Sequence, residues 1–406
     1  MAEEAGEEVL RRTGCAPSFN HGPKILWWKD RRPQEFRAVR SFVQPGGYAA
    51  MRLTGLGAAD AFIDWTYLHF SGFADNPAGR WDEALAQRFG LDAALLPRIV
   101  EPHSVVGELS GAMARRAGLA AGTAVVAGCG DTAASFLACG ATEPGISVDV
   151  AGTASVFAST APAFRPDVGH RVLGCGRAAT PGLWHPYACI NGGGMNVEWF
   201  LREVANRGGR RGRAGLKLQD LDRLAARLPL RGTDPFFVPH MEGRVCPGQP
   251  HLRGAWAGLS WSHTLGHLYR AVLESVALEY AIYRRILAQL YPGQALREVR
   301  ITGGGARSRL WNRLKAAALQ TPVLEITGGE GAPMGAAMVA AWGAGLVKDL
   351  PAAAARWVRL GRRHPPDARR ADYYRRRAAP YRRLLEAMDA FGRRAADLDE
   401  PAATIE

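Results

Sequence analysis

Two glycine turns, each placed directly after a short β-branched run, constrain what this chain can fold into. The first follows Val125 and Val126, where Gly128-Cys129-Gly130 leads through Asp131 into a helix of small residues. A strand, a glycine turn and a helix in this order are typical of α/β folds. Because Asp131 stands where an N-cap residue belongs, the sequence predicts one carboxylate at the mouth of this helix.

After that helix the sequence predicts a hairpin whose turn suits a phosphate. Residues 146–150 alternate apolar and polar side chains and run into Gly152 and Thr153. The backbone N–H groups of such a turn, together with the hydroxyl of Thr153, can cradle a phosphate group. We therefore expect Asp131 and the turn at Gly152 to face one cleft.

The second glycine turn follows the predicted strand at residues 298–302. Gly303, Gly304 and Gly305 come directly after it, and Ser308 is a suitable N-cap for a helix over residues 309–320. Glycines after a strand let the backbone approach a ligand closely, and a helix N-terminus favours anions, so a nucleotide is expected here. An ordinary tight turn is the alternative.

Two nucleotide-binding folds fit the sequence less well. Residues 128–133 match G-x-G-x-x-A after a strand, and Asp149 lies about twenty residues further on, as in a dinucleotide-binding fold. However, Asp131 would place a negative charge where the pyrophosphate must sit, and Asp149 leads into a hairpin rather than a crossover helix. A P-loop kinase is excluded because G-x-x-x-x-G-K-[ST] is absent from the sequence.

The sequence offers no strong metal site. Apolar residues recur at helical spacing over residues 263–290, which are expected to form the longest helix. His263 and His267 lie four residues apart on it, which is the spacing of two ligands on one helical face. No third ligand and no H-E-x-x-H glutamate accompany them, so we expect no metal-ligating residues there.

The composition of the chain limits which class of protein it can be. The 406 residues are 47% hydrophobic and 22% charged, which predicts a chain of two domains. No window approaches eighteen apolar residues, and the acidic first eight residues lack the features of a signal peptide, so we expect a cytoplasmic protein without a membrane partner.

The net charge of +13 comes largely from one segment, residues 356–394, with thirteen arginines against four acids. Its Tyr374, Tyr381 and Leu385 share one helical face, which favours a solvated amphipathic helix over a surface for stacking RNA bases. We therefore expect no nucleic-acid partner. The basic residues 207–215 are expected to form a surface loop, with a phosphate-binding patch as the alternative.

Several motifs together resemble those of one family, the FGGY carbohydrate kinases. Residues 254–259 and 267–274, with seven residues between them, match the second signature of that family at every constrained position. Four further motifs follow in the order of the family: GCGDTAA at 128–134, AGT at 151–153, GGGARSRLWNRL at 303–314 and GAAMVAAWGAGL at 335–346. Residues 23–28 and 48–55 resemble the xylulokinase-like branch.

The resemblance implies an actin-like fold of two ribonuclease-H-like α/β domains, and a kinase that uses ATP and Mg²⁺ to phosphorylate a sugar such as D-xylulose. Asp131 matches the general base of the family, which takes the proton from the sugar hydroxyl. Gly152 and Thr153 match the second phosphate loop. Gly303, Gly304, Gly305 and Asn312 match the adenosine-binding segment. A homodimer is a further expectation.

The chain also departs from the family pattern. The D-x-G-T phosphate loop with which such kinases open is not found before Asn20, and the usual G-E-R-x-P stretch is altered at residues 242–247. We therefore expect an incomplete first domain at 1–144, a second domain with a terminal helix at 145–395, and a disordered tail at 396–406. Two functions stay open: a ketopentose kinase, although the activity of this chain by itself is doubtful, or a non-catalytic relic that binds nucleotide or a partner protein.

Overall fold

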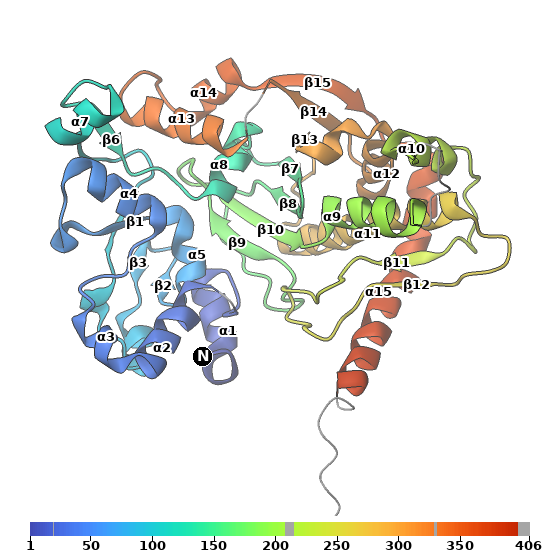
Figure 1. The fold of residues 1–406 in the computed structure, drawn as a ribbon, viewed down its shortest axis with the longest axis horizontal. Helices are drawn as coiled ribbons and strands as arrows, with labels where there is room; N and C mark the ends of the chain where they lie inside the picture. Colours follow the sequence, from blue (N-terminus) through green and yellow to red (C-terminus); the bar gives the residue numbers. More distant parts are fainter. Residues whose placement is uncertain (19, 208–214, 329–330, 397–406) are drawn as a thin grey trace, which may run out of the picture. The chain divides into compact units, whose positions relative to one another are not determined.

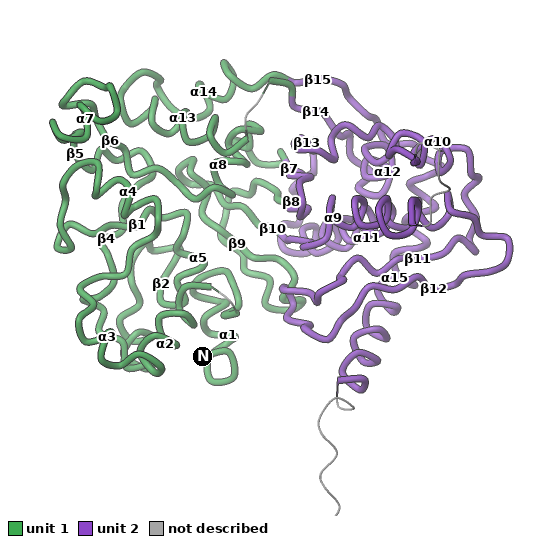
Figure 2. The backbone as a smooth tube through the Cα atoms, viewed as in Figure 1, with its two compact units in different colours: residues 1–146, 158–187, 327–359 green, residues 147–157, 188–326, 360–406 purple. Residues whose placement is uncertain are grey.

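The computed structural model describes all residues except 19, 208–214, 329–330 and 397–406. The chain packs into two compact units, and both are discontinuous in sequence (Figures 1 and 2). Unit 1 comprises residues 1–146, 158–187 and 327–359, and unit 2 comprises residues 147–157, 188–326 and 360–406. These units do not test the domain boundary expected at residue 144, which stays a prediction.

Unit 1 consists mainly of short helices with small two-stranded sheets. Its helices are α1 (Ala2–Thr13), α2 (His21–Arg31), α3 (Pro33–Ala38), α4 (Pro45–Thr54), α5 (Leu68–Ser71), α6 (Glu83–Arg88), α7 (Gly111–Ala117), α8 (Asp131–Ala138), α13 (Ala332–Gly343) and α14 (Leu350–Trp357). Its three two-stranded sheets each pair two short strands. They are parallel β1 (Phe62–Asp64) with β4 (Arg98–Val100), antiparallel β2 (Ala74–Asp75) with β3 (Arg80–Trp81), and antiparallel β5 (Val105–Glu108) with β6 (Ala124–Val126).

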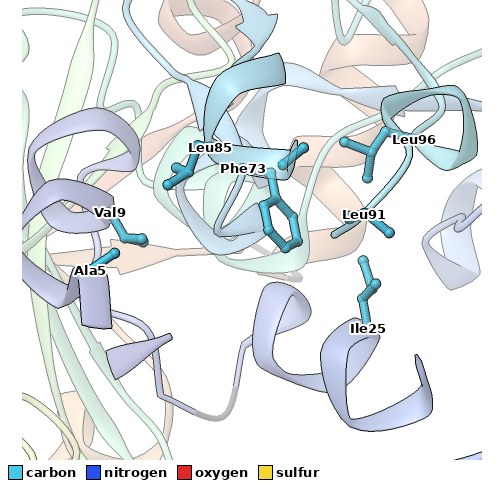
Figure 3. Close-up of a cluster of buried hydrophobic side chains, with 8 residues drawn as sticks. Ala5, Val9, Ile25, Phe73, Leu85, Leu91 and Leu96 are labelled. Atoms are coloured by element: carbon cyan, nitrogen blue, oxygen red, sulfur yellow. The ribbon is translucent and has the colours of Figure 1, made fainter. Parts of the chain in front are cut away.

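The amino-terminal helices of unit 1 share an apolar core. Side chains from α1, α2 and α6 meet around Phe73, which is fully buried (Figure 3). Val9 and Leu85 are buried there to a similar degree. Burial of a Val or Leu side chain contributes about 1.5–3 kcal/mol. The residues that precede β1 are therefore an integral part of this unit.

Helix α8, which begins with Asp131, packs against α13. The contact is close because Gly335 of α13 lies against the backbone of α8: a Cβ atom at Gly335 would lie 1.9 Å from the carbonyl oxygen of Ala134. Leu137, Met338 and Val339 are buried at this interface. The motif at 335–346 thus fixes the helix that carries the candidate base.

Unit 2 is built around helix α11 (Leu265–Leu290), most of whose residues are buried. Its other elements are α9 (Gly193–Trp199), which continues as a π-helix (Phe200–Ala205), α10 (Leu218–Ala226), α12 (Arg309–Leu319), α15 (Ala368–Ala396), β11 (Phe236–Val238), β12 (Ala255–Ala257) and β13 (Glu298–Thr302). α11 packs against α10, α12 and α15. The expected helix at 263–290 is confirmed, with its start at Leu265.

A seven-stranded sheet has the order β15-β14-β13-β7-β8-β10-β9. Its strands not yet named are β7 (Ile146–Ala151), β8 (Ser155–Ser159), β9 (Gly174–Arg177), β10 (Trp184–Ile190), β14 (Val323–Thr327) and β15 (Arg359–His364). β13 and β14 pair in parallel, with Val299 opposite Val323. The predicted run of strand, glycine turn, helix and strand at 298–326 is therefore confirmed.

The arginine-rich segment includes β15, and most of it forms α15, which at 29 residues is longer than α11, so the expectation that 263–290 is the longest helix is wrong. Tyr374, Tyr381 and Leu385 are buried, as the amphipathic pattern predicts. The hydroxyls of Tyr374 and Tyr381 donate to Glu274 and Glu279, each at 3.0 Å. These rings therefore offer no stacking surface.

Two expectations concern residues that the structure does not describe. The basic stretch at 207–215 falls mostly on residues 208–214, and the tail at 396–406 falls almost wholly on 397–406. Within the described chain, no helix has the length and apolar character that a membrane span requires.

We expect Gly335→Ala to lower the free energy of unfolding by at least about 1–3 kcal/mol, because the added methyl group must displace the backbone of α8. Urea unfolding followed by tryptophan fluorescence measures this change. Gly111→Ala is the matched control, since a Cβ atom at Gly111 would meet only the end of the Arg115 side chain, at 3.7 Å. Equal loss of stability in the two variants would contradict the close packing of α8 on α13.

Candidate active site

Asp131 lies at the start of α8, just after the first glycine turn. Its residue is exposed, and its Oδ1 accepts hydrogen bonds from the backbone N–H of Thr132 at 2.7 Å and from the Thr132 hydroxyl at 3.3 Å. The N-cap residue is Gly130, not Asp131 as the sequence suggested. Asp131 is instead the first helical residue, where the helix dipole favours a negative charge.

A small pocket in unit 1 contains Asp131 in its wall. Its other walls come from three segments far apart in sequence: Thr66, Tyr67, His69 and Phe70; Ala133 and Phe136; and Gly176, Arg177, His185 and Tyr187. The sequence predicts none of these neighbours, because no local motif marks the segments 66–70 and 176–187. Aromatic and polar groups thus surround a single carboxylate.

The two histidines of this pocket are uncharged at neutral pH. Burial is the main influence on both, and it lowers the pKa of His69 to about 3 and that of His185 to about 4. The Nε2 of His69 and the hydroxyl of Tyr187 are joined by a hydrogen bond of 3.0 Å. Arg177 lies 5.1 Å from the ring of Trp65 and donates to the carbonyl of Pro77 at 2.9 Å. The pocket therefore offers hydrogen-bonding groups and one cation beside Asp131.

In unit 2, the turn at Gly152 and Thr153 and the turn at Gly303 approach each other at backbone distance. Gly303 has a φ of 89°, and a Cβ atom there would lie 2.6 Å from the carbonyl oxygen of Ala151. A Cβ atom at Gly305 would lie 2.8 Å from the Cβ atom of Ala151. The structure thus brings together two glycine turns that lie about 150 residues apart in the chain, which suits a site where backbone must approach a ligand.

A third glycine segment, which the sequence reasoning missed, contacts the turn at Gly152 and Thr153. The N–H of Gly194, in the first turn of α9, donates to the carbonyl of Gly152 at 3.0 Å, and that of Met195 donates to Thr153 at the same distance. A Cβ atom at Gly194 would lie 2.4 Å from the oxygen of Gly152. The run Gly192-Gly193-Gly194 after a predicted strand is the signal that would have found it.

These turns line an open pocket of unit 2 with a volume of about 520 Å³. Asp222 of α10 organises one wall: its Oδ1 accepts the hydroxyl of Tyr269 at 3.0 Å and its Oδ2 accepts the hydroxyl of Ser308 at 2.8 Å. Ser308 also caps α12 by accepting the N–H of Trp311 at 3.1 Å, as the sequence predicts. Backbone turns form one side of this pocket, and Trp311 and Tyr269 contribute aromatic rings.

Asn312 lies behind this wall rather than in it. It is fully buried, and its Nδ2 donates to the carbonyl of Ala306 at 2.8 Å. Among the described residues that line the pocket, Gly304 and Gly305 are present and Asn312 is not. The position of Asn312 suits a residue that supports the glycine turn.

A buried ion pair connects β7, which precedes the first turn, to α12, which follows the second turn. The Nζ of Lys315 lies 2.6 Å from the Oδ2 of Asp149, and the hydroxyl of Tyr280 donates to the Oδ1 at 2.6 Å. Burial lowers the pKa of Lys315, and Asp149 opposes that effect. Lys315 also lies 4.0 Å from the ring centroid of Trp311. Asp149, considered above as the acidic residue of a dinucleotide-binding fold, is therefore a structural partner.

The altered stretch at 242–247 contributes to a buried network. Arg244 donates to the Oε2 of Glu279 at 2.8 Å, and the Nε2 of His240 lies 3.2 Å from its Oε1. Burial raises the pKa of Glu279, but Arg244, His240 and Tyr381 together lower it to about 2. Glu279 is thus ionised, and the stretch is anchored to α11.

The described residues contain no group of three or more His, Cys, Asp or Glu side chains that could hold a metal ion. The Nδ1 of His267 accepts the N–H of Thr264 at 3.1 Å, and that of His263 accepts the N–H of Ser260 at 3.0 Å. Both rings thus hold the chain near the start of α11.

Models of both domains of the FGGY family of carbohydrate kinases match the chain, the N-terminal domain over residues 2–138 and the C-terminal domain over residues 148–344. The chain is also 32% identical over 381 residues to the glycerol kinase of Citrifermentans bemidjiense, an alignment that covers 91% of this chain and 73% of that protein. The chain belongs to the FGGY family of carbohydrate kinases.

Other similar proteins carry the name xylulose kinase. The chain is 24% identical over 380 residues to that of Bacillus subtilis, covering 92% of this chain and 72% of the relative. A solved structure of the xylulose kinase from Rhodospirillum rubrum matches with a TM-score of 0.84 at 29% identity, over 97% of this chain and 77% of that chain. The two-domain actin-like fold expected from the resemblance is confirmed. This FGGY kinase spans about 70% of the length of several such relatives.

We expect Lys315→Met to lower the free energy of unfolding by about 3–5 kcal/mol, because it leaves the buried carboxylate of Asp149 without its cation. Arg313→Met, on the exposed side of the same helix, should change it by no more than about 0.5 kcal/mol. Urea unfolding of both variants measures the difference.

The double variant Asp149→Asn with Lys315→Met completes the test, since removing both charges should restore part of the loss. Stability of the single Lys315→Met variant equal to that of the unaltered chain would show that the pair does not hold the turns.

Proposed function

We propose that this FGGY kinase transfers the γ-phosphoryl group of ATP to a hydroxyl of a ketopentose such as D-xylulose. The observation that carries the proposal is the exposed Asp131 carboxylate at the start of α8, in a pocket with the neutral His69 and with Tyr187. The names of the relatives support the substrate class, since those from Bacillus subtilis and Rhodospirillum rubrum are called xylulose kinases. The relatives named above are all kinases, which gives no support to a non-catalytic relic.

In the proposed reaction, Asp131 takes the proton of the sugar hydroxyl as that oxygen attacks the γ-phosphorus, and ADP leaves. The uncharged His69, Tyr187 and the charged Arg177 suit a small polyhydroxyl substrate, because they supply hydrogen-bonding groups at the walls of its pocket. Phosphoryl transfer depends mainly on positioning and on charge stabilisation. The residues of the pocket would accordingly orient the sugar, and Asp131 would receive its proton.

For the nucleotide, we propose that backbone N–H groups at Gly152 and at residues 303–305 hold phosphates, with the hydroxyl of Thr153 beside them. The adenosine would lie in the pocket near Gly304 and Trp311. Asn312 would act through the turn, since its amide holds Ala306.

The side chains of the described residues also limit how Mg²⁺ could bind. The described residues assemble no carboxylate cage, and Mg²⁺ commonly binds through one or two carboxylates together with substrate phosphates. We propose that the phosphates of ATP would hold Mg²⁺, which would neutralise part of their charge. We also propose a cytoplasmic location, because the cytoplasm supplies ATP. A homodimer and the lack of a nucleic-acid partner stay predictions.

Asp131→Asn should lower kcat for sugar phosphorylation by about 10²–10⁴-fold, because the amide cannot take the proton of the hydroxyl. ATP affinity, measured by titration calorimetry, should stay nearly unchanged. Release of ADP with D-xylulose, D-ribulose, L-fuculose, gluconate and glycerol gives the rate and the preferred sugar. A variant that turns over its sugar as fast as the unaltered chain would remove Asp131 from the mechanism.

Gly304→Asp should weaken ATP binding while leaving the fold intact. A Cβ atom at Gly304 meets nothing within 4 Å, so the side chain fits, but its carboxylate would repel the phosphates. Gly304→Ala is the matched control and should bind ATP as the unaltered chain does. Titration calorimetry with ATP and ADP measures both. Equal affinity in the aspartate and alanine variants would mean that the turn at 303–305 has a structural role only.

A further inference from the structure

The helix that carries Asp131 is attached at its first turn to a segment more than sixty residues earlier. Thr66 follows β1 in a short 3₁₀ turn (Trp65–Tyr67), and its residue is 3% exposed. Its Oγ1 accepts the backbone N–H of Gly130 at 2.9 Å. Gly130 is the residue immediately before Asp131, so this bond acts one peptide away from the proposed base.

Asp64 fixes the direction of the Thr66 hydroxyl. The Oδ1 of Asp64 accepts the backbone N–H of Thr66 at 2.9 Å and also accepts the hydroxyl hydrogen of Thr66. A threonine hydroxyl has a single hydrogen to donate. Because that hydrogen is directed at Asp64, the lone pairs of Oγ1 are left to accept the N–H of Gly130. Burial raises the pKa of Asp64 to about 7, and both bonds from Thr66 oppose that effect.

The same segment packs closely on Gly130. A Cβ atom at Gly130 would lie 3.3 Å from two atoms of the Tyr67 ring and 3.5 Å from the Oγ1 of Thr66. Tyr67 and Thr66 also line the pocket that contains Asp131. The hydrogen bond and this packing therefore act on the same peptide.

Local sequence does little to fix the start of α8. Its N-cap residue is a glycine that forms no capping side-chain hydrogen bond, and Gly128 nearby has a φ of 80°. Glycine has more backbone freedom than any other residue. The orientation of the first helical residue must therefore come from outside the helix, and Thr66 supplies a directed contact there.

We infer that Thr66, oriented by Asp64, is a positioning residue for the reaction: it holds the N–H of Gly130 and so sets where the carboxylate of Asp131 meets the sugar hydroxyl. This inference rests on the proposed function of Asp131 as general base. Misplacing a reacting group by about 1 Å can lower a rate by about 10²-fold. Loss of the Thr66 hydroxyl should act mainly on kcat.

The test compares Thr66→Val, which keeps the shape but loses the hydroxyl, with Thr66→Ser, which keeps the hydroxyl. With the preferred sugar, Thr66→Val should lower kcat by about 10–10²-fold, and Thr66→Ser should restore most of it. The affinity for ATP should be the same in both. Ser110→Ala is the control, because it removes the N-cap of α7 in the same unit without touching α8. Equal losses of kcat in Ser110→Ala and Thr66→Val would overturn the inference.

Hydrogen exchange of the Gly130 amide tests the contact with Thr66 independently of the proposed function. The amide should exchange slowly in the unaltered chain and in Thr66→Ser, and faster in Thr66→Val. Faster exchange with an unchanged kcat would overturn the positioning role, and unchanged exchange would overturn the hydrogen bond itself.

Absence of sugar phosphorylation by the unaltered chain would contradict the proposed function, and the exchange rates then decide alone whether Thr66 holds Gly130. Should Thr66→Val fail to fold, rapid exchange of the Gly130 amide in the unaltered chain or in Thr66→Ser would still overturn the inference.

Discussion

The carbonyl of Ala151 sets the geometry of the proposed nucleotide pocket in unit 2. Gly303 and Gly305 lie so close to Ala151 that any side chain would collide with it. Such an approach persists only if the elements on both sides are held firmly. The buried Lys315 and Asp149 pair provides this, because Asp149 is two residues before Ala151 on β7 and Lys315 is on the helix that follows the second turn. An ion pair within hydrogen-bond distance tolerates little displacement, so it fixes the separation of the two turns.

In unit 1 the start of α8 is also held in place, but by different contacts. The start of α8 is a glycine turn with little conformational preference of its own, yet the proposed role of Asp131 requires that it be held in one place. Packing of Gly335 against Ala134 holds the body of the helix, and the Thr66 hydroxyl holds the peptide before it. One contact is steric and acts along the helix, and the other is a directed hydrogen bond. Together they define both the axis and the start of α8.

Local signals in the sequence predicted much of this arrangement. The two glycine turns, the strand at 146–151, the N-cap at Ser308 and the long helix ending at Leu290 all have local causes, namely side-chain periodicity, capping chemistry or the backbone freedom of glycine. Asp131 was found because it follows such a turn. Its assignment as N-cap was wrong because Gly130 takes that place, a shift of one residue that propensity alone does not resolve.

The neighbours of these residues could not be read from the sequence, because they depend on how distant segments pack. His69 and Tyr187 are 118 residues apart and form one hydrogen bond, and Asp222 holds Ser308 across 86 residues. Each pair has ordinary polar residues that serve equally well on a surface. Asn312 is the opposite case, because the sequence marked the residue but not where its side chain lies. Its motif indicated adenosine binding, but its burial and its bond to Ala306 suit a supporting role for the glycine turn. A motif can thus indicate a segment, while tertiary packing decides which of its side chains line the pocket.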